Sequence, residues 1–389
     1  MKFLRRLLPL ALAARLFAVD AAQLPDGLYA EFTTPRGAFV CELFYQKVPM
    51  TVINFVGLAE GSLAPRNGQP FYTGLKWYRV VPNFVIQSGD PNTPSGGIQE
   101  RAKPDAQEEP EVGPYTFLDE FVPGLHHDAA GVLSMANAGP DTNGWEFFVT
   151  LRDTNRLNYL HSVFGRTVRG VDVLPKIQQG DALAIKILRV GAAAQAFKAD
   201  GAAFTRLLMA AKPYAGAPEP GPASHFDDPF KILPVEPPRA KAFNFKLANF
   251  ERVTGVRIVG RIFPRSPSKA QDAQPGAFMH ALAAQLGVAK RGALAAYFAD
   301  EKDWRVWIGD ESTAAFAGRA MSATELAPEG AFHTVTEAFL EAAEKQGDAE
   351  FAAQQKTGIA GLPPPTPAQR IKLQTDAILD GLIFKLEPK

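Results

Sequence analysis

The sequence predicts a multidomain protein, in which an N-terminal closed antiparallel β-barrel with flanking helices precedes a C-terminal α/β (α+β) domain. Three observations support this fold class. The chain has 389 residues, which is too long for one ordinary domain. Short strand-like runs with only one or two helices fill the first half, as in a barrel or sandwich. A stretch rich in proline and glycine then separates them from alternating strands and helices.

The composition is that of a globular protein with no overall charge. Hydrophobic residues make up 46% and charged residues 21%, while 41 basic residues balance 41 acidic ones. No general field would attract nucleic acid, so nucleic-acid binding is not expected. The single cysteine, Cys41, excludes an internal disulfide framework and lies in an alternating apolar run. We interpret it as a small core residue, with a redox role as the alternative.

The first 22 residues have the pattern of a signal peptide. A basic MKFLRR precedes an apolar run, and small residues around Ala21 offer a cleavage site. We therefore expect an exported protein, located in the periplasm, with no stable membrane span once the signal is removed. Arg15 interrupts the apolar run, so a short amphipathic helix is the alternative, and the signal could also act uncleaved as an anchor.

Residues 30–44 alternate in two apolar runs around a Thr-Thr-Pro-Arg-Gly turn, which predicts a hairpin. A helix is expected to begin at Pro49 and to end at Gly61, because the apolar spacing changes to that of a helix. In the next strand-like run Pro82 implies a kink or an edge position. The strand-like runs lie at residues 76–87, 131–135, 147–151, 162–166 and 184–190.

A helix is expected over residues 192–211, followed by a linker to residue 240. Prolines and glycines are so frequent in this linker that no regular element is expected to persist. The second half then alternates. Its strands are expected at residues 254–263, 293–298 and 305–308, and its helices at 276–288, 331–345 and 367–382.

Three separated motifs in the first half resemble the cyclophilin-type peptidyl-prolyl isomerases. They are YAEFTTPRGAFVCELFYQKVPMTVINFVGLAEG, WYRVVPNFVIQSGDP, and GVLSMANAGPDTNGWEFFVTL with LHSVFGRTVRG. Their order and spacing match the family over residues 24–191, which we assign as the isomerase domain. Residues 192–240 form the helix and linker, and residues 241–389 form an accessory domain.

The resemblance implies a non-covalent isomerase that needs no cofactor or metal and acts on proline-containing polypeptides, as a monomer. Arg79 would be the catalytic residue, and Gln87 would bond the substrate main chain and orient that arginine. Ala136 and Asn137 would offer their backbone to an extended peptide. The remaining residues implied to bind substrate are Phe84, Val85, Glu146, Phe148, Leu157 and His161.

These residue types suit the reaction. Rotation about an X-Pro bond crosses a barrier of about 18–20 kcal/mol that comes from amide resonance. An apolar cup can hold the proline ring, while a guanidinium donor favours the twisted imide whose nitrogen lone pair is localised. Phe147 and Phe148 are adjacent on one strand, so one is expected in the core and the other in the cup.

Two residues depart from the family's pattern. Where the family usually has Ser-Gln before the paired phenylalanines, this chain has Trp145-Glu146. An ionised Glu146 accepts hydrogen bonds but does not donate them, and an ion pair with Arg79 would restrain the catalytic donor. Arg156 replaces the tryptophan of cyclosporin-sensitive members, so weak drug binding is expected.

The second half resembles a TPM domain over residues 243–348. The usual aspartate-containing first strand is missing there, and residues 225–228 are a possible remnant of it. Some TPM relatives are described as phosphatases or cation binders, for which Asp303, Asp310 and Glu311 are candidate carboxylates, with a solvated acidic turn as the alternative. The expected function is therefore X-Pro isomerisation that assists folding of exported proteins. The alternatives are a proline-binding chaperone or assembly module, or a phosphatase-like activity in the second domain.

Overall fold

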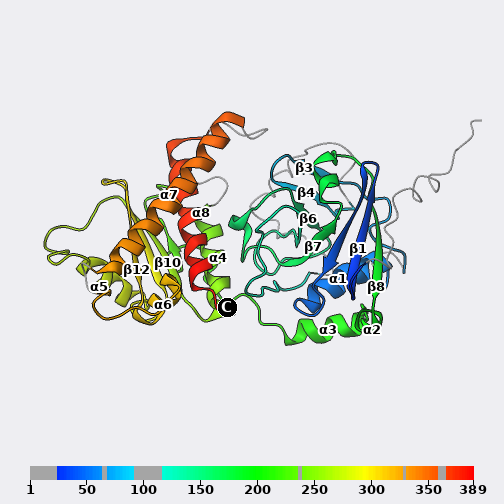
Figure 1. The fold of residues 1–389 in the computed structure, drawn as a ribbon, viewed down its shortest axis with the longest axis horizontal. Coiled ribbons are helices and arrows are strands. Elements are labelled where there is room, and N and C mark those ends of the chain that lie inside the picture. The colour runs from blue at the N-terminus through cyan, green and yellow to red at the C-terminus, as the bar shows by residue number, and fades with distance from the viewer. Residues whose placement is uncertain (1–23, 64–67, 92–115, 235–238, 327–329, 358–364) are drawn as a thin grey trace, which may run out of the picture. The chain divides into compact units, whose positions relative to one another are not determined.

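The computed structural model describes residues 24–63, 68–91, 116–234, 239–326, 330–357 and 365–389 (Figure 1). The predicted signal peptide lies outside these residues. The chain divides into two compact units. The first contains residues up to Asn155 and His161–Pro213, and the second contains Arg156–Leu160 and Tyr214–Lys389. In the described part of the chain, we find no helix with the length and hydropathy that a membrane crossing requires.

The first unit is built on an eight-stranded antiparallel sheet with the order β3-β4-β6-β5-β7-β2-β1-β8. All eight strands overlap the seven runs predicted as strands, because β3 and β4 share the run at residues 76–87. The strands are β1 (Gly27–Thr34), β2 (Gly37–Leu43), β3 (Arg79–Val81), β4 (Val85–Ser88), β5 (Val132–Met135), β6 (Phe147–Thr150), β7 (Val163–Arg169) and β8 (Ala184–Val190). The first two form the predicted hairpin, with Thr34 opposite Gly37 across the turn.

The prediction of one kinked strand at residues 76–87 is wrong, because the chain reverses there. Pro82 and Asn83 separate β3 from β4, which pair antiparallel. Asn83 has φ 57°, a left-handed conformation that asparagine tolerates better than most residues. A proline followed by such a residue produces a turn, which places β3 at an edge of the sheet.

The prediction of a closed barrel is also too strong. The sheet curls into a half-barrel, and among the described residues no continuous ladder joins its edge strands β3 and β8. A short seam lies between their preceding segments, where Lys76 forms an isolated bridge with Ala182. Three backbone bonds support the seam: Trp77 N to Asp181 O at 3.0 Å, Gly180 N to Trp77 O at 2.8 Å, and Leu183 N to Leu75 O at 3.1 Å. Arg36 of the β1–β2 turn donates to Asp181, which fixes the segment before β8 beside that turn.

Helix α1 (Pro49–Glu60) begins at the predicted proline and ends at Gly61, which has φ 83°. Its N-terminus has no cap from its own side chains, but the Glu120 carboxylate accepts hydrogen bonds from the backbone N–H groups of Met50 and Thr51 at 3.2 and 2.8 Å. A carboxylate satisfies the unpaired donors of a helix start and interacts favourably with its dipole. The helix is thus attached to the loop before β5.

Aromatic rings fill the interior of the first unit. The Phe147 ring lies 5.4–5.8 Å from those of Phe32, Phe55, Tyr72 and Trp77. Cys41 is fully buried in the same cluster, as predicted. Burial raises the pKa of its thiol to about 12, so the unreactive thiol form is favoured.

The second unit has a mixed four-stranded sheet with the order β12-β11-β10-β9. Its strands are β9 (Phe226–Asp227), β10 (Ile258–Phe263), β11 (Ala293–Phe298) and β12 (Asp303–Ile308). Strand β9 lies in the stretch expected to contain no regular element. It persists because Phe226 and Asp227 pair in parallel with Gly260 and Arg261, far away in sequence.

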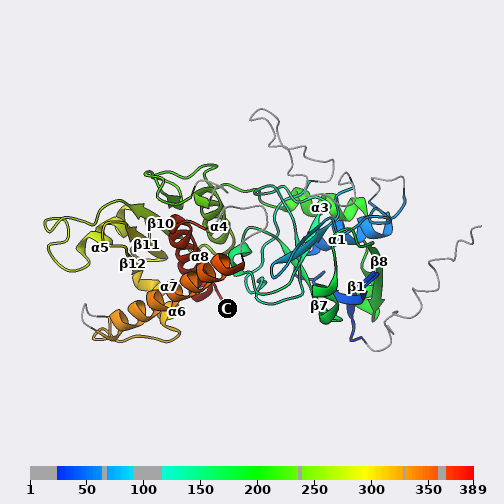
Figure 2. The ribbon, with the colours of Figure 1, turned by 90° about the horizontal axis from the view of Figure 1, so that it is seen from above.

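The two views place the sheet of the second unit between α5 on one side and α4 with α8 on the other (Figures 1 and 2). Leu294, Ala296 and Phe298 of β11 pack against Met279 and Ala283 of α5. Helix α4 occupies residues that no prediction assigned to a helix. The helices of the chain are completed by α2 (Ala192–Ala196), α3 (Gly201–Ala210), α4 (Arg239–Thr254), α5 (Ala277–Gln285), α6 (Thr313–Ala317), α7 (Ala331–Thr357) and α8 (Pro367–Leu386).

The central position of Phe147 leads to a stability prediction. We expect Phe147→Ala to lower the free energy of unfolding of the first unit by about 3–5 kcal/mol, because it leaves a cavity among rings that have no room to collapse. Urea denaturation of the full chain measures the loss. Met209→Ala is the control, since Met209 is 83% exposed and its loss should change stability little. Equal midpoints for the two variants would contradict the packing role.

Candidate active site

Strand register aligns four polar and aromatic residues across one face of the first sheet. Arg79 lies opposite Gln87, Gln87 opposite Phe148, and Phe148 opposite Ser134. Residues directly opposite each other on neighbouring strands present their side chains on the same face. The row Arg79-Gln87-Phe148-Ser134, which we call the cross-strand row, therefore brings the predicted catalytic arginine and the cup phenylalanine onto one surface.

The paired phenylalanines divide between the two faces as expected. Phe147 belongs to the aromatic core, whereas Phe148 is absent from that cluster and stands in the cross-strand row. Val85 lies two residues before Gln87 on β4 and opposite Thr150. Alternation places it on the face of the row, where it is only 1% exposed. Val85 thus forms a wall on the face of the row and lies outside the barrel core.

A hydrogen-bond network extends from Arg79 to Glu146. Arg79 Nη1 donates to Gln87 Oε1 at 3.0 Å, and Gln87 Nε2 donates to Glu146 Oε2 at 2.9 Å. The hydroxyl of Tyr78 also donates to Glu146 Oε2, and it accepts a hydrogen bond from Gln87 Nε2. The Gln87 amide therefore bridges Glu146 and Arg79. By accepting from its nitrogen, Glu146 keeps the amide oxygen directed at the Arg79 guanidinium.

Phe148 is flanked by two histidines. Its ring is stacked with that of His127 at 5.7 Å and meets His161 edge-on at 5.4 Å. His161 Nδ1 donates to the backbone carbonyl of Met135 at 3.1 Å, and His127 Nε2 is 2.9 Å from Ser134 Oγ. Burial lowers the pKa of the His161 imidazole to about 4. His161 therefore stands beside the aromatic ring as a neutral group.

The predicted backbone rail lies next to Glu146. The N–H of Ala136 donates to the Glu146 carbonyl at 3.0 Å, so a peptide would use the carbonyl of Ala136 and the groups of Asn137. The loop that follows is braced by Asp119, which accepts hydrogen bonds from Asn143 Nδ2 at 2.8 Å and from Asp141 N at 2.9 Å. Ala136 and Asn137 themselves are half-buried.

Phe84 and Leu157 have different environments. Phe84 follows the β3–β4 turn, half-buried, and its carbonyl accepts a hydrogen bond from Leu151 N at 2.8 Å. Leu157 is half-buried in a 3₁₀ turn, Asn155–Leu157, and lies in the short segment grouped with the second unit. In that segment the Tyr159 ring meets Phe250 of α4 at 5.2 Å, and Asn249 Nδ2 donates to the Tyr159 carbonyl at 3.1 Å. Arg156 belongs to the same segment.

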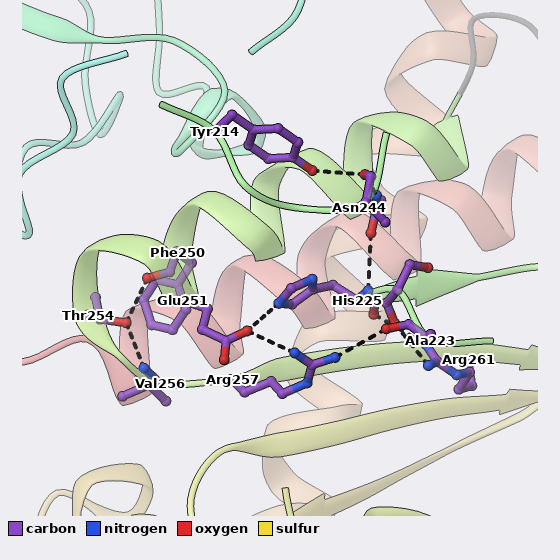
Figure 3. Close-up of polar contacts among 12 residues, drawn as sticks. Tyr214, Ala223, His225, Asn244, Phe250, Glu251, Thr254, Val256, Arg257 and Arg261 are labelled. Carbon is purple, nitrogen blue, oxygen red and sulfur yellow. Dashed lines mark hydrogen bonds and ion pairs between the residues drawn. The ribbon is translucent and has the colours of Figure 1, made fainter. Parts of the chain in front are cut away.

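The polar residues of the second unit form local pairs. Figure 3 shows His225 and Arg257 both directed at Glu251, with Arg257 Nη1 at 3.0 Å, while Asn244 accepts a hydrogen bond from the His225 backbone. Arg261 binds the backbone carbonyls of Pro222, Ser224, His225 and Gly260. These contacts hold the segment that leads into β9, the proposed remnant strand.

The candidate carboxylates of the second unit do not gather into a site. Asp303 lies beside Arg305, with its Oδ2 3.5 Å from Nε, and Asp310 and Glu311 occupy a short 3₁₀ turn, Asp310–Ser312. Asp228 accepts hydrogen bonds from the backbone of Ile232 and Leu233, which fixes a turn. Across the described ranges no three His, Cys, Asp or Glu side chains are placed to hold a metal ion together.

Sequence reasoning missed three residues of this surface, namely Tyr78, His127 and Ser134. Ser134 alternates with Leu133 and Met135 on β5, so strand periodicity could have found it. Tyr78 directly precedes β3, and alternation would have placed it on the face opposite Arg79. His127 lies in an irregular segment seven residues before Ser134. Only the folded structure brings its ring to Phe148.

The low pKa of His161 has a measurable consequence. Between pH 6.5 and 4 the unfolded chain binds a proton at this histidine and the folded chain does not, so stability should fall as the pH drops through this range. We expect the NMR signals of the His161 ring to stay those of the neutral form from pH 8 down to pH 5. His161→Asn should weaken the acid destabilisation. A ring that titrates near pH 6.5 would contradict the burial argument.

Comparisons with known proteins point to the same family as the sequence motifs that form this surface. The family described as "Cyclophilin type peptidyl-prolyl cis-trans isomerase/CLD" matches residues 29–192. A relative named "Peptidyl-prolyl cis-trans isomerase-like 1" from Aspergillus fumigatus is 38% identical over 147 residues, which are 38% of this chain and 79% of the relative. The human protein of the same name is 39% identical over 154 residues, which are 39% of this chain and 80% of that protein. A "Probable peptidyl-prolyl cis-trans isomerase A" from Mycobacterium leprae is 42% identical over 144 residues, 35% of this chain and 71% of that protein.

The half-barrel presents an arginine beside an aromatic surface, and the relatives are matched over most of their length. The chain therefore belongs to the cyclophilin-type peptidyl-prolyl cis-trans isomerase family.

Proposed function

We propose that the first unit accelerates rotation about X-Pro bonds in exported polypeptides, with Arg79 as the donor to the twisting imide. The observation that carries this assignment of roles is the cross-strand row, in which Arg79 and Phe148 share one face with Gln87 between them. The proline ring would lie against Phe148, Val85 and Phe84. The guanidinium would approach the imide nitrogen as its lone pair becomes localised.

Such a surface can supply the stabilisation of the transition state that this step requires. A rate gain of about 10⁵ requires roughly 7 kcal/mol of stabilisation in the transition state relative to the ground state. Arg79 is exposed, so its charge-assisted hydrogen bond would gain strength when the bound peptide excludes water, and an arginine held in advance by Gln87 costs little to reorganise. The ground-state imide, whose lone pair is delocalised, would receive less of this stabilisation.

Replacement of Arg79 tests the proposal. We expect Arg79→Ala in the full chain to lower the catalysed cis/trans exchange of an Ala-Pro peptide by about 10²–10³-fold, as for other single donors to a transition state. Exchange can be measured by NMR, with peptide binding followed in the same titration. Arg166→Ala is the matched control, because Arg166 is an arginine of the same unit that is paired with Asp128 at the surface.

Two results would overturn the assignment in different ways. Unchanged exchange in Arg79→Ala would remove the arginine from the mechanism. Binding of the peptide by the native chain without any exchange would favour the alternative of a proline-binding chaperone. The phosphatase alternative for the second unit finds no observation in its favour among the described residues.

Export is part of the same proposal and is supported by the basic and then apolar sequence of the first 22 residues. We expect these residues, fused to a reporter enzyme that is active only outside the cytoplasm, to yield activity. A fusion with Leu10→Asp and Leu12→Asp, which interrupts the apolar run, should be inactive. Equal activities of the two fusions would contradict a signal function.

A further inference from the structure

The Glu146 carboxyl group lies beside the cross-strand row, and its hydrogen-bond partners are both neutral. Both of its side-chain hydrogen bonds, from the Tyr78 hydroxyl and the Gln87 amide, end on the same atom, Oε2. Within the described ranges, Oε1 accepts no hydrogen bond, and no lysine, arginine or histidine lies at ion-pair distance from this carboxylate. The side chain is half-buried, so one acceptor atom remains available to a ligand.

The position of Glu146 places that acceptor beside the peptide path. Phe147 points into the core, so Glu146 and Phe148 on either side of it face outward together. The backbone carbonyl of Glu146 holds Ala136 of the predicted rail, and its side chain reaches Arg79 through Gln87. A peptide that lies between the rail and the arginine passes this carboxylate.

The local charge is more negative than Arg79 alone suggests. The pKa of the Tyr78 hydroxyl is raised first by burial, and then by the negative charges of Glu146 and Asp90, while Arg79 opposes them. Two carboxylates and one guanidinium thus act on one phenol. A substrate cation placed next to Glu146 would be attracted by its carboxylate and by that of Asp90, while Arg79 would oppose them.

We infer that Glu146 is a specificity-determining residue, which makes this isomerase prefer X-Pro bonds that have a lysine or arginine within two residues before the proline. The inference rests on the proposed function of the same surface and adds the class of substrate to it. The carboxylate would pair with the substrate cation through Oε1 while Oε2 continues to hold Gln87. A neutral amide at this position would keep the second contact and lose the first.

The experiment compares matched peptides on the full chain. The peptides carry Lys, Gln or Glu at the first or the second position before the proline. We expect kcat/KM for the better lysine peptide to exceed that for its glutamate counterpart by about three- to fivefold, the range of a partly solvated ion pair. In Glu146→Gln the ratio should fall to near one, because glutamine has the same size and still accepts hydrogen bonds from Tyr78 and Gln87.

Salt and a control variant separate a charge effect from a structural one. Raising the ionic strength from 0.01 to 1 M shortens the Debye length from about 30 to about 3 Å, so the lysine preference of the native chain should shrink. Asp172→Asn removes one negative charge at an exposed ion pair with Lys176, away from the row, and should leave the preference intact. A merely structural role of Glu146 would change all peptides alike and would not respond to salt.

The outcomes separate the isomerase activity from the substrate preference. No exchange of any peptide, with or without charge, would overturn the proposed function itself. Exchange with equal kcat/KM for lysine and glutamate peptides, or a preference that persists in Glu146→Gln, would overturn the substrate class and leave the isomerase intact.

Discussion

The site depends on one geometric constraint, namely that adjacent side chains of a β-strand point to opposite faces. Four surrounding rings hold Phe147 in the core. Because adjacent residues of a strand alternate, Phe148 must then lie on the opposite face, which carries the cross-strand row. A slip of β6 by one residue would move Phe147 to the face of the row and Phe148 to the aromatic core, and would replace every neighbour in the row. The aromatic interior therefore determines the register that brings Arg79, Gln87 and Phe148 together.

The Gln87 amide joins the two charged members of this surface. Its oxygen accepts from Arg79 and its nitrogen donates to Glu146, so the amide is satisfied in only one orientation. Rotation by half a turn would bring its NH₂ group against the guanidinium and its oxygen against the carboxylate. Two opposite charges on either side of a glutamine thus hold it more firmly than a neutral neighbour would. The arginine is presented in a fixed direction before any peptide arrives.

Local patterns predicted most of the first unit, because alternation and turn residues act over a few positions. The hairpin at β1 and β2, the proline at the start of α1 and the division of Phe147 from Phe148 all follow from such patterns. Strand β11 also lies at the residues expected. The assignment of site residues by family resemblance was consistent with this frame, since the register brings Arg79 and Phe148 onto one face.

Features that depend on distant residues were not predictable in the same way. Strand β9 exists only because β10, far away in sequence, supplies its partners. The reversal at Pro82 is local instead, and apolar runs on both sides of the turn made it resemble one continuous strand. The stacking of His127 on Phe148 joins an irregular segment to a strand. The half-open sheet likewise depends on where two edges meet, a question of curvature that short sequence patterns do not address.

The seam between the segments before β3 and β8 is a place where the first unit can open locally. Only a few main-chain bonds close it, and two of them involve Trp77, whose ring packs against Phe147 in the aromatic interior. Desolvation raises the pKa of the Asp181 carboxyl, but hydrogen bonds from the Arg36 guanidinium and the Gln178 backbone outweigh it and hold the pKa below its usual range, which favours the charged form that binds Arg36 next to the seam. Parting of these bonds would admit water to the indole while the ladders of the eight strands stay paired, so amide protons of this region should exchange with solvent sooner than those of β1.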